Sequence, residues 1–266
     1  MLLPRVISAV ILGPMFLALV WLGFPYFGIL IAAMAGVMAA EFANMDGRRG
    51  PMQRGAIVLT CVLAAAATAW VSTAMALAVV VIGTLATMIA DQASGRRGLH
   101  LIHVAVAYVA LPAIAMIYVR GFDPEGATRA LSLFWLLAIV WGTDIGAYAC
   151  GRIIGGPKLA PAISPKKTWS GAIGGLVFGM GASAGVLWLY GAQIGSKPLI
   201  VALVAAVATE LGDLLESGLK RWYEVKDSGT LIPGHGGLLD RFDGLWVAAP
   251  VVALFCWVFG GGVHQW

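Results

Sequence analysis

Nine long apolar stretches constrain the fold of this 266-residue chain more than any other feature of its sequence. Each is close to the roughly 20 residues that a helix needs to cross the hydrocarbon core of a bilayer. Lipid offers the backbone no hydrogen-bond partners, so a crossing segment must satisfy its own N–H and C=O groups, as a helix does. The sequence therefore predicts an all-α, polytopic transmembrane bundle with spans at roughly 6–22, 26–43, 56–73, 74–90, 101–119, 130–150, 170–190, 198–219 and 244–260. Whether the third and fourth stretches are two spans or one long broken helix stays open.

The distribution of lysine and arginine orients this bundle. With nine spans, the N-terminus and the connections after spans two, four, six and eight lie on one side of the membrane. Only three of the 17 lysine and arginine residues fall on the other side: Arg120, Arg129 and Lys197. Cytoplasmic loops are enriched in these residues. We therefore expect a cytoplasmic N-terminus and the polar connections on the cytoplasmic side, with the C-terminal tail outside. The same bias accounts for the net charge of +4, so no nucleic-acid partner is expected.

Small residues in the seventh stretch predict a face for helix packing. Gly171, Gly175 and Gly179 recur every four residues, a spacing that lets membrane helices approach closely. The three cysteines lie far apart within apolar stretches, so they indicate neither a disulfide framework nor a metal site. They are Cys61, Cys150 and Cys256.

Acidic residues inside the eighth stretch are the first sign of chemistry. Glu210, Asp213 and Glu216 stand in an otherwise apolar segment, followed by Ser217 and Lys220. Carboxylates at membrane depth are costly, and they normally face protein or water, where they serve a function. The alternative is a structural ion pair of Asp213 or Glu216 with Lys220, but one pair does not account for three carboxylates.

A second pair of carboxylates, Asp240 and Asp243, begins the last apolar stretch and is spaced by one helical turn. An aspartate at a helix N-terminus often only caps the helix, and for Asp243 alone the two interpretations have equal weight. Together with Asp213, these residues form a set of oxygen ligands suited to Mg²⁺, which shares its coordination with phosphates. The preceding turn contains His235, Gly236 and Gly237. Its glycines would let backbone N–H groups approach a phosphate.

The connection between the sixth and seventh stretches is the other polar region. Asp144 lies near the end of the sixth stretch, and Lys166 and Lys167 lie between a proline and a Thr-Trp pair. That position favours a formed anion site over a loose basic run. Glu41, near the end of the second stretch, is expected to lie at the membrane interface.

These residues resemble the signature of the phosphatidate cytidylyltransferase (CDP-diacylglycerol synthase) family. The signature reads S-x-x-K-R-x4-K-D, followed by P-x-H-G-G-x-x-D-R-x-D, and this chain matches every polar position. The matching residues are Ser217, Lys220, Arg221, Lys226, Asp227, Pro233, His235, Gly236, Gly237, Asp240, Arg241 and Asp243. A second similar block runs from Asp144 to Tyr148 and from Ser164 to Trp169, where this chain has Ser170 in place of the glutamate that many members carry.

The resemblance implies a Mg²⁺-dependent nucleotidyltransferase of phospholipid synthesis. It would join CTP and phosphatidic acid into CDP-diacylglycerol with release of pyrophosphate, as a homodimer among membrane lipids. Residues 1–125 would form N-terminal anchoring helices and residues 126–266 the catalytic region; whether a second cation joins the Mg²⁺ stays open. The expected catalytic residues are Asp213, Lys220, Asp240 and Asp243, with the three aspartates as metal ligands. The expected substrate contacts are Asp144, Lys166, Lys167, Ser217, Arg221, Lys226, Asp227, His235, Gly236, Gly237 and Arg241.

Two other functions stay open from the sequence. A CTP-dependent lipid kinase would need a base for a lipid hydroxyl, and Asp227 or His235 offers one. An ion-coupled transporter would use Asp144, Glu210 and Asp213 as a cation path. That function predicts charges near the middle of the bilayer, whereas these charges cluster toward one side.

Overall fold

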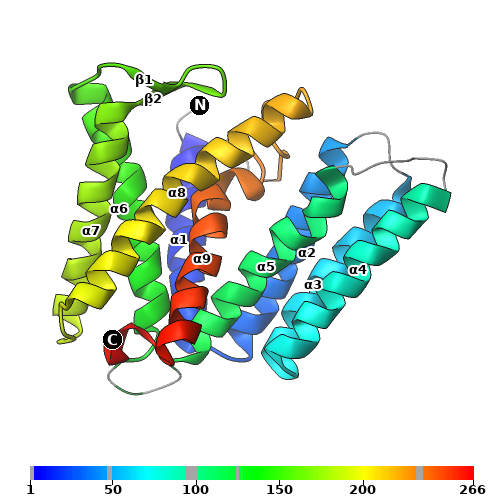
Figure 1. The fold of residues 1–266 in the computed structure, drawn as a ribbon, viewed down its shortest axis with the longest axis horizontal. Coiled ribbons are helices and arrows are strands. Elements are labelled where there is room, and N and C mark those ends of the chain that lie inside the picture. The colour runs from blue at the N-terminus through cyan, green and yellow to red at the C-terminus, as the bar shows by residue number, and fades with distance from the viewer. Residues whose placement is uncertain (1–2, 47–49, 94–100, 124–125, 127, 232–235) are drawn as a thin grey trace. The chain divides into compact units, whose positions relative to one another are not determined.

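The computed structural model describes residues 3–46, 50–93, 101–123, 126, 128–231 and 236–266. Within these ranges, eight helices are long and apolar enough to cross a membrane, and a shorter apolar segment spans Val10–Leu22. The predicted all-α polytopic bundle is confirmed, and the chain is a multi-pass membrane protein (Figure 1). The elements are α1 (Leu3–Leu22), α2 (Tyr26–Met45), α3 (Pro51–Trp70), α4 (Thr73–Ala93), α5 (Leu101–Gly121), α6 (Leu131–Ile153), β1 (Lys158–Ala160), β2 (Ser164–Thr168), α7 (Trp169–Leu189), α8 (Ser196–Trp222), α9 (Leu239–Phe259) and a short 3-10 helix, η1 (Val263–Gln265).

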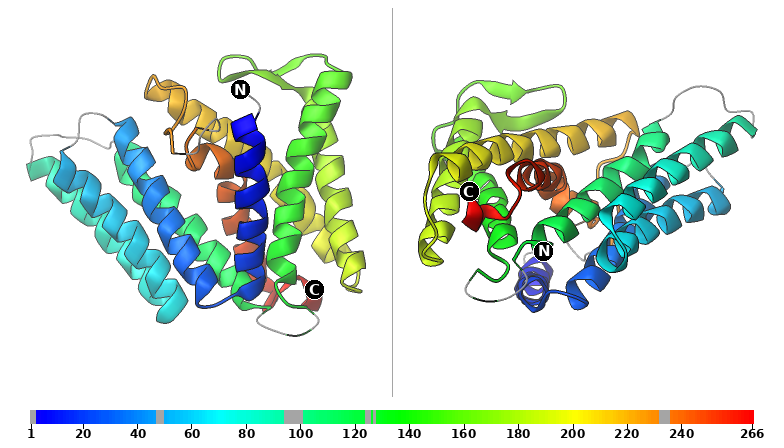
Figure 2. Two further views of the ribbon diagram at one scale, coloured as in Figure 1. Left: turned by 180° about the vertical axis from the view of Figure 1, so that it is seen from behind. Right: turned by 60° about the horizontal axis from the view of Figure 1, so that its bottom comes forward.

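The third and fourth apolar stretches are two separate helices. The hydroxyl of Ser72 accepts the backbone N–H of Met75 at 3.1 Å, which caps the start of α4 just after α3 has ended. The two helices then pack side by side, with Gly83 of α4 against the side chain of Thr60 of α3 (Figure 2). The connection is thus a tight helical hairpin, which settles the alternative left open by the sequence.

The residues divide into two compact units that are interleaved along the chain. Unit 1 contains Met1–Tyr118 and Tyr223–Phe242, and unit 2 contains Val119–Trp222 and Asp243–Trp266. In unit 1, α2 packs against α1 and α3, and its fully buried Phe27, Ile31 and Met38 form part of the core. The functional division expected at residue 125 stays a prediction. By contacts, the segment 223–242 belongs with the N-terminal helices.

Unit 2 is built around the pairing of α6 with α7, which α8 packs against. A Cβ atom added to Gly171 would come within 2.8 Å of the Ala147 carbonyl oxygen, and one added to Gly175 within 3.0 Å of the Thr143 carbonyl oxygen. Only glycine allows the two backbones to lie this close. The packing face predicted in the seventh stretch is therefore confirmed, and it lies within the chain.

The polar connection between α6 and α7 forms a small β-hairpin that the sequence analysis did not predict. β1 and β2 are antiparallel, with Lys158 opposite Thr168 and Ala160 opposite Ser164. Thr168 then caps α7, because its hydroxyl accepts the N–H of Gly171 at 3.1 Å. Ser170 then donates its hydroxyl to the carbonyl oxygen of Gly155. The hairpin lies beside the adjoining ends of α6 and α7 (Figures 1 and 2).

The C-terminal residues lie at the opposite end of α6 from the hairpin. The N–H of Val263 donates to the hydroxyl of Ser132 at 2.9 Å, and His264 Nδ1 lies 2.8 Å from Asp123 Oδ1. With 23 residues, α6 is about 34 Å long, which is enough to cross a bilayer core. Within unit 2, the hairpin and the C-terminus are thus separated by a membrane thickness.

Candidate active site

Unit 2 gathers carboxylates from three helices around a single lysine of the hairpin. Lys167 Nζ lies 2.7 Å from Glu210 Oε2 and 2.9 Å from Asp213 Oδ2, both on α8. Asp144 of α6 interacts electrostatically with Lys167, with the two α8 carboxylates and with Asp243 of α9. Four carboxylates therefore share one neighbourhood at the hairpin end of the unit.

A close crossing of α8 and α9 places two of these carboxylates together. A Cβ atom added to Gly212 would come within 2.6 Å of the Asp243 carbonyl oxygen and 3.1 Å of Gly244 Cα. One added to Gly244 would come within 2.7 Å of Thr209 Cγ2. Because both helices have glycine at the crossing, Asp213 and Asp243, each next to one of these glycines, lie close enough to interact electrostatically.

The strand geometry of β2 distinguishes the two adjacent lysines. Successive side chains of a strand point to opposite faces. Accordingly, Lys166 is exposed, whereas the side chain of Lys167 is only 18% exposed and donates to Glu210 and Asp213. Burial lowers the pKa of Lys167, but the carboxylates of Asp213 and Glu210 outweigh it and raise the pKa above the ordinary lysine value. Lys167 is therefore a charged part of the cluster at neutral pH.

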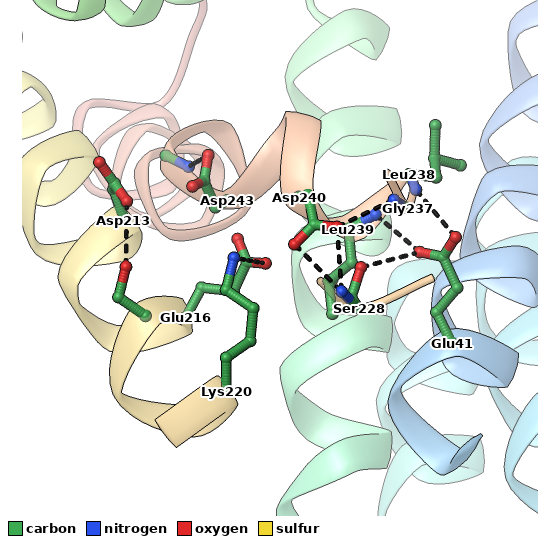
Figure 3. Close-up of polar contacts among 12 residues, drawn as sticks. Glu41, Asp213, Glu216, Lys220, Ser228, Gly237, Leu238, Leu239, Asp240 and Asp243 are labelled. Carbon is green, nitrogen blue, oxygen red and sulfur yellow. Dashed lines mark hydrogen bonds and ion pairs between the residues drawn. The ribbon is translucent and has the colours of Figure 1, made fainter. Parts of the chain in front are cut away.

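Lys220 forms a second ion pair, one helical turn from Glu216. Its Nζ lies 3.1 Å from Glu216 Oε1, and the Glu216 side chain is 1% exposed (Figure 3). Ser217 donates its hydroxyl to Asp213 Oδ1 at a long 3.5 Å. The ion pair considered as an alternative for this helix is therefore present between Glu216 and Lys220, while the cation beside Asp213 is Lys167. The catalytic role of Lys220 stays a prediction.

Residues 223–242, which contain most of the second half of the signature, belong to unit 1, and Asp243 belongs to unit 2. In unit 1, Asp240 joins the backbone at Ser228 to the backbone at Gly237. Its carboxylate accepts the N–H of Gly237 at 2.8 Å and the N–H of Ser228 at 3.0 Å (Figure 3). Gly236 has φ of +85°, a conformation that side chains other than glycine rarely adopt. The amide of Gly237 is thus bonded inside the loop, and the phosphate contacts predicted for the two glycines stay predictions.

Glu41 makes a contact that the sequence analysis did not predict. Its expected position at the membrane interface stays a prediction, but within the protein the side chain is buried, with 7% exposure. Its two carboxylate oxygens accept the N–H groups of Leu238 at 2.9 Å and Leu239 at 2.8 Å (Figure 3). The first N–H groups of a helix have no partner within it, so the start of α9 requires such an acceptor. No local pattern reveals this contact, because its partners lie nearly 200 residues apart.

The other predicted substrate contacts are mostly exposed cations. Arg221 follows the cluster at the end of α8, and Lys226, Asp227 and Arg241 are exposed in unit 1. His235 and Pro233 of the signature lie outside the described residues.

The donor chemistry of the cluster fits a hard divalent cation such as Mg²⁺, since all its acidic groups offer carboxylate oxygens. Among the residues that the structure describes, no three His, Cys, Asp or Glu side chains are already arranged as metal ligands. Of the predicted ligands, Asp213 and Asp243 belong to unit 2 and Asp240 to unit 1. The metal site therefore stays a prediction supported by the donor set.

The chain is similar to known proteins along most of its length. A protein named phosphatidate cytidylyltransferase from Brucella suis biovar 1 (strain 1330) is 36% identical over 265 residues, which cover 96% of this chain and 93% of that protein. Proteins of the same name from Bacillus subtilis (strain 168) and Staphylococcus haemolyticus (strain JCSC1435) are 39% and 40% identical over 58% and 56% of this chain, and 58% and 55% of their own lengths. The model of the cytidylyltransferase family matches residues 3–259. This chain belongs to the cytidylyltransferase family.

Proposed function

We propose that this protein is a phosphatidate cytidylyltransferase, which joins CTP and phosphatidic acid into CDP-diacylglycerol and releases pyrophosphate. The observation that carries the proposal is the match of a relative of that name along 96% of the chain. The residues of the two signature blocks and the cluster of carboxylates and lysines in unit 2 support it.

The reaction requires the protein to position the phosphates of the two substrates and to neutralise their charge. An oxygen of the phosphatidate phosphate attacks the α-phosphorus of CTP, so a new O–P bond forms while the bond from the α-phosphorus to the departing pyrophosphate breaks. The attacking group is already an ionised phosphate, so no strong base is needed. Holding the two phosphates in line then supplies much of the catalysis.

Specific residues fit these tasks. Asp213 and Asp243 would hold Mg²⁺, which when bound neutralises phosphate charge. The family resemblance implies the same role for Asp240. Lys167 keeps Asp213 in place through their 2.9 Å ion pair. The exposed cations would bind the phosphates of the two substrates: Lys166, Arg221, Lys226 and Arg241. Lys220 is held beside Glu216 at the end of α8, within reach of the same cluster.

The site would face the cytoplasm from the inner membrane. Fourteen of the 17 lysine and arginine residues fall on the side that carries the hairpin and the signature segment, which supports this orientation. CTP is a cytosolic solute, and the phosphate of phosphatidic acid lies at headgroup level, near the hairpin end of unit 2. The family resemblance favours a homodimer. The comparisons offer no support for a CTP-dependent lipid kinase or an ion-coupled transporter.

A comparison of two lipid acceptors tests the proposal. Purified protein in detergent, given CTP and Mg²⁺, should release pyrophosphate when the acceptor is phosphatidic acid. With diacylglycerol, which has a hydroxyl in place of the phosphate, it should release none. The Asp213→Asn variant, which keeps the size of the side chain but removes its charge, is the matched control and should be inactive. Turnover with diacylglycerol and release of CDP would instead indicate a lipid kinase.

A further inference from the structure

One buried carboxylate of the N-terminal helices contacts the signature segment without belonging to the signature. Glu41 lies on α2, and its two carboxylate oxygens accept hydrogen bonds from the backbone N–H groups of Leu238 and Leu239 at the start of α9. Its Oε2 atom also lies 3.5 Å from the hydroxyl of Ser228. The carboxylate thus joins two backbone segments, one at Ser228 and the other at Leu238.

The packing around this carboxylate leaves little room for any other arrangement. A Cβ atom added to Gly229 would come within 2.7 Å of Glu41 Oε1, and one added to Gly237 within 2.8 Å of Glu41 Oε2. Two glycines therefore surround the carboxylate, so that the loop backbone lies directly against it. A carboxylate also suits this place electrostatically, because the N-terminus of a helix carries partial positive charge.

The same loop holds Asp240 in a fixed orientation. Asp240 accepts N–H groups from Ser228 and Gly237, and these residues are the ones packed against Glu41. Glu41 and Asp240 therefore clamp one loop from two directions (Figure 3). Movement of the Leu238 and Leu239 amides would turn the first helical turn of α9, and Asp240 with it.

We propose that Glu41 is a positioning residue of the enzyme: its buried carboxylate fixes the first turn of α9 and thereby the orientation of Asp240. The inference concerns the reaction stated under the proposed function and rests on it for its kinetic test. The clamp itself is a structural property, and hydrogen exchange measures it without reference to any reaction.

Three variants of the purified full-length protein separate this role from general stability. Glu41→Gln keeps the size of the side chain but replaces one carboxylate oxygen by an NH₂ group, which cannot accept a hydrogen bond from a backbone N–H. Glu41→Asp keeps the charge and is too short to hold both amides. Asn44→Ala is the control, because Asn44 lies three residues further along α2 and accepts instead from Arg54 at 2.9 Å.

Hydrogen exchange is the first measurement. In Glu41→Gln, peptides that cover 236–242 should exchange about tenfold faster or more, while peptides from α3 and α4 stay as in the wild type. Asn44→Ala should leave 236–242 unchanged. Faster exchange spread over all of unit 1, or wild-type exchange at 236–242, overturns the proposal. If Glu41→Gln does not fold, hydrogen exchange of Glu41→Asp tests the proposal instead. The expected result is a smaller acceleration of exchange, confined to the peptides that cover 236–242.

Steady-state kinetics give the second measurement. The loss of one charge-assisted hydrogen bond should lower kcat by about 10- to 100-fold in Glu41→Gln and by less in Glu41→Asp. The KM for CTP should stay within about threefold of wild type, since Glu41 positions Asp240 from behind the loop. A rise in KM with unchanged kcat overturns the proposal. Absence of cytidylyl transfer by the wild type would refute the proposed function, while the exchange result would still report on the clamp.

Discussion

Replacement of Lys167 by alanine is predicted to destabilise the protein, whereas replacement of its neighbour Lys166 is not. Lys167 is the partner of two carboxylates, and its loss leaves Glu210, whose side chain is 11% exposed, next to Asp213 without a cation. Removing one partner of a fully buried pair costs about 3–5 kcal/mol. Asp213 is 40% exposed, and solvent screens its share strongly. We therefore expect a loss of about 2–3 kcal/mol.

The prediction is measured by thermal unfolding of the purified protein in detergent. A loss of this size should lower the Tm of Lys167→Ala by about 5–10 °C. Lys166→Ala removes an exposed lysine from the same strand and should change stability by no more than about 0.5 kcal/mol. Activity, normalised to correctly inserted protein, should fall by about 100-fold or more in Lys167→Ala, because Asp213 loses the cation that orients it.

A second substitution checks the electrostatic reason. In Lys167→Ala/Glu210→Gln, the buried carboxylate that lost its partner is replaced by a neutral amide, so part of the lost Tm should return. Activity should not return, since Asp213 still lacks its cation. Equal and small Tm changes in Lys166→Ala and Lys167→Ala, or no recovery in the double variant, would refute the reasoning.

Three further outcomes are expected. Asp213→Asn and Asp243→Asn should each lower turnover at least tenfold, about 1.4 kcal/mol of barrier, in folded protein; a smaller loss argues against a metal or phosphate role. The pKa of Lys167 is raised in the folded protein, so the stabilisation by its ion pairs is complete below the unfolded lysine pKa of about 10.4 and is lost only as the pH rises through the higher folded value. The Tm difference between wild type and Lys167→Met should therefore be constant from about pH 7.5 to 9. A decrease of this difference over that range contradicts the ion pairs. In a background without the native cysteines, Ala162→Cys should react with impermeant thiol reagents only from the cytoplasmic side and Gln265→Cys only from the outside; labelling of both from one side rules out the nine-span topology.

The helices could be predicted from the sequence because lipid enforces a simple rule on every crossing segment. Long apolar stretches must be helical, so the spans follow from hydropathy. The separation of α3 from α4 did not follow from hydropathy, because only a few residues lie between the two stretches. The hairpin was missed because its strands are short and polar and contain a proline, and because only pairing across a few residues stabilises them. Local propensity does not signal such a pair.

The acidic residues of the candidate site could be predicted for a similar reason. Carboxylates in apolar helices are rare, so Asp213, Asp240 and Asp243 are conspicuous in the sequence. The residues that contact the carboxylates are not conspicuous in the sequence. The pairing of Lys167 with Glu210 bridges 43 residues, and the contact of Glu41 with Leu238 bridges 197. Such contacts depend on tertiary packing, which periodicity and spacing do not encode.

The fate of the labelled phosphates of CTP tests the proposed reaction most directly. Purified protein is given phosphatidic acid, Mg²⁺ and CTP labelled with ³²P at either the α- or the γ-phosphate, and the lipid fraction is counted. Cytidylyl transfer predicts that the α-label enters the lipid and that the γ-label leaves in pyrophosphate. Entry of the γ-label into the lipid, with the α-label left in CDP, would contradict the proposed function.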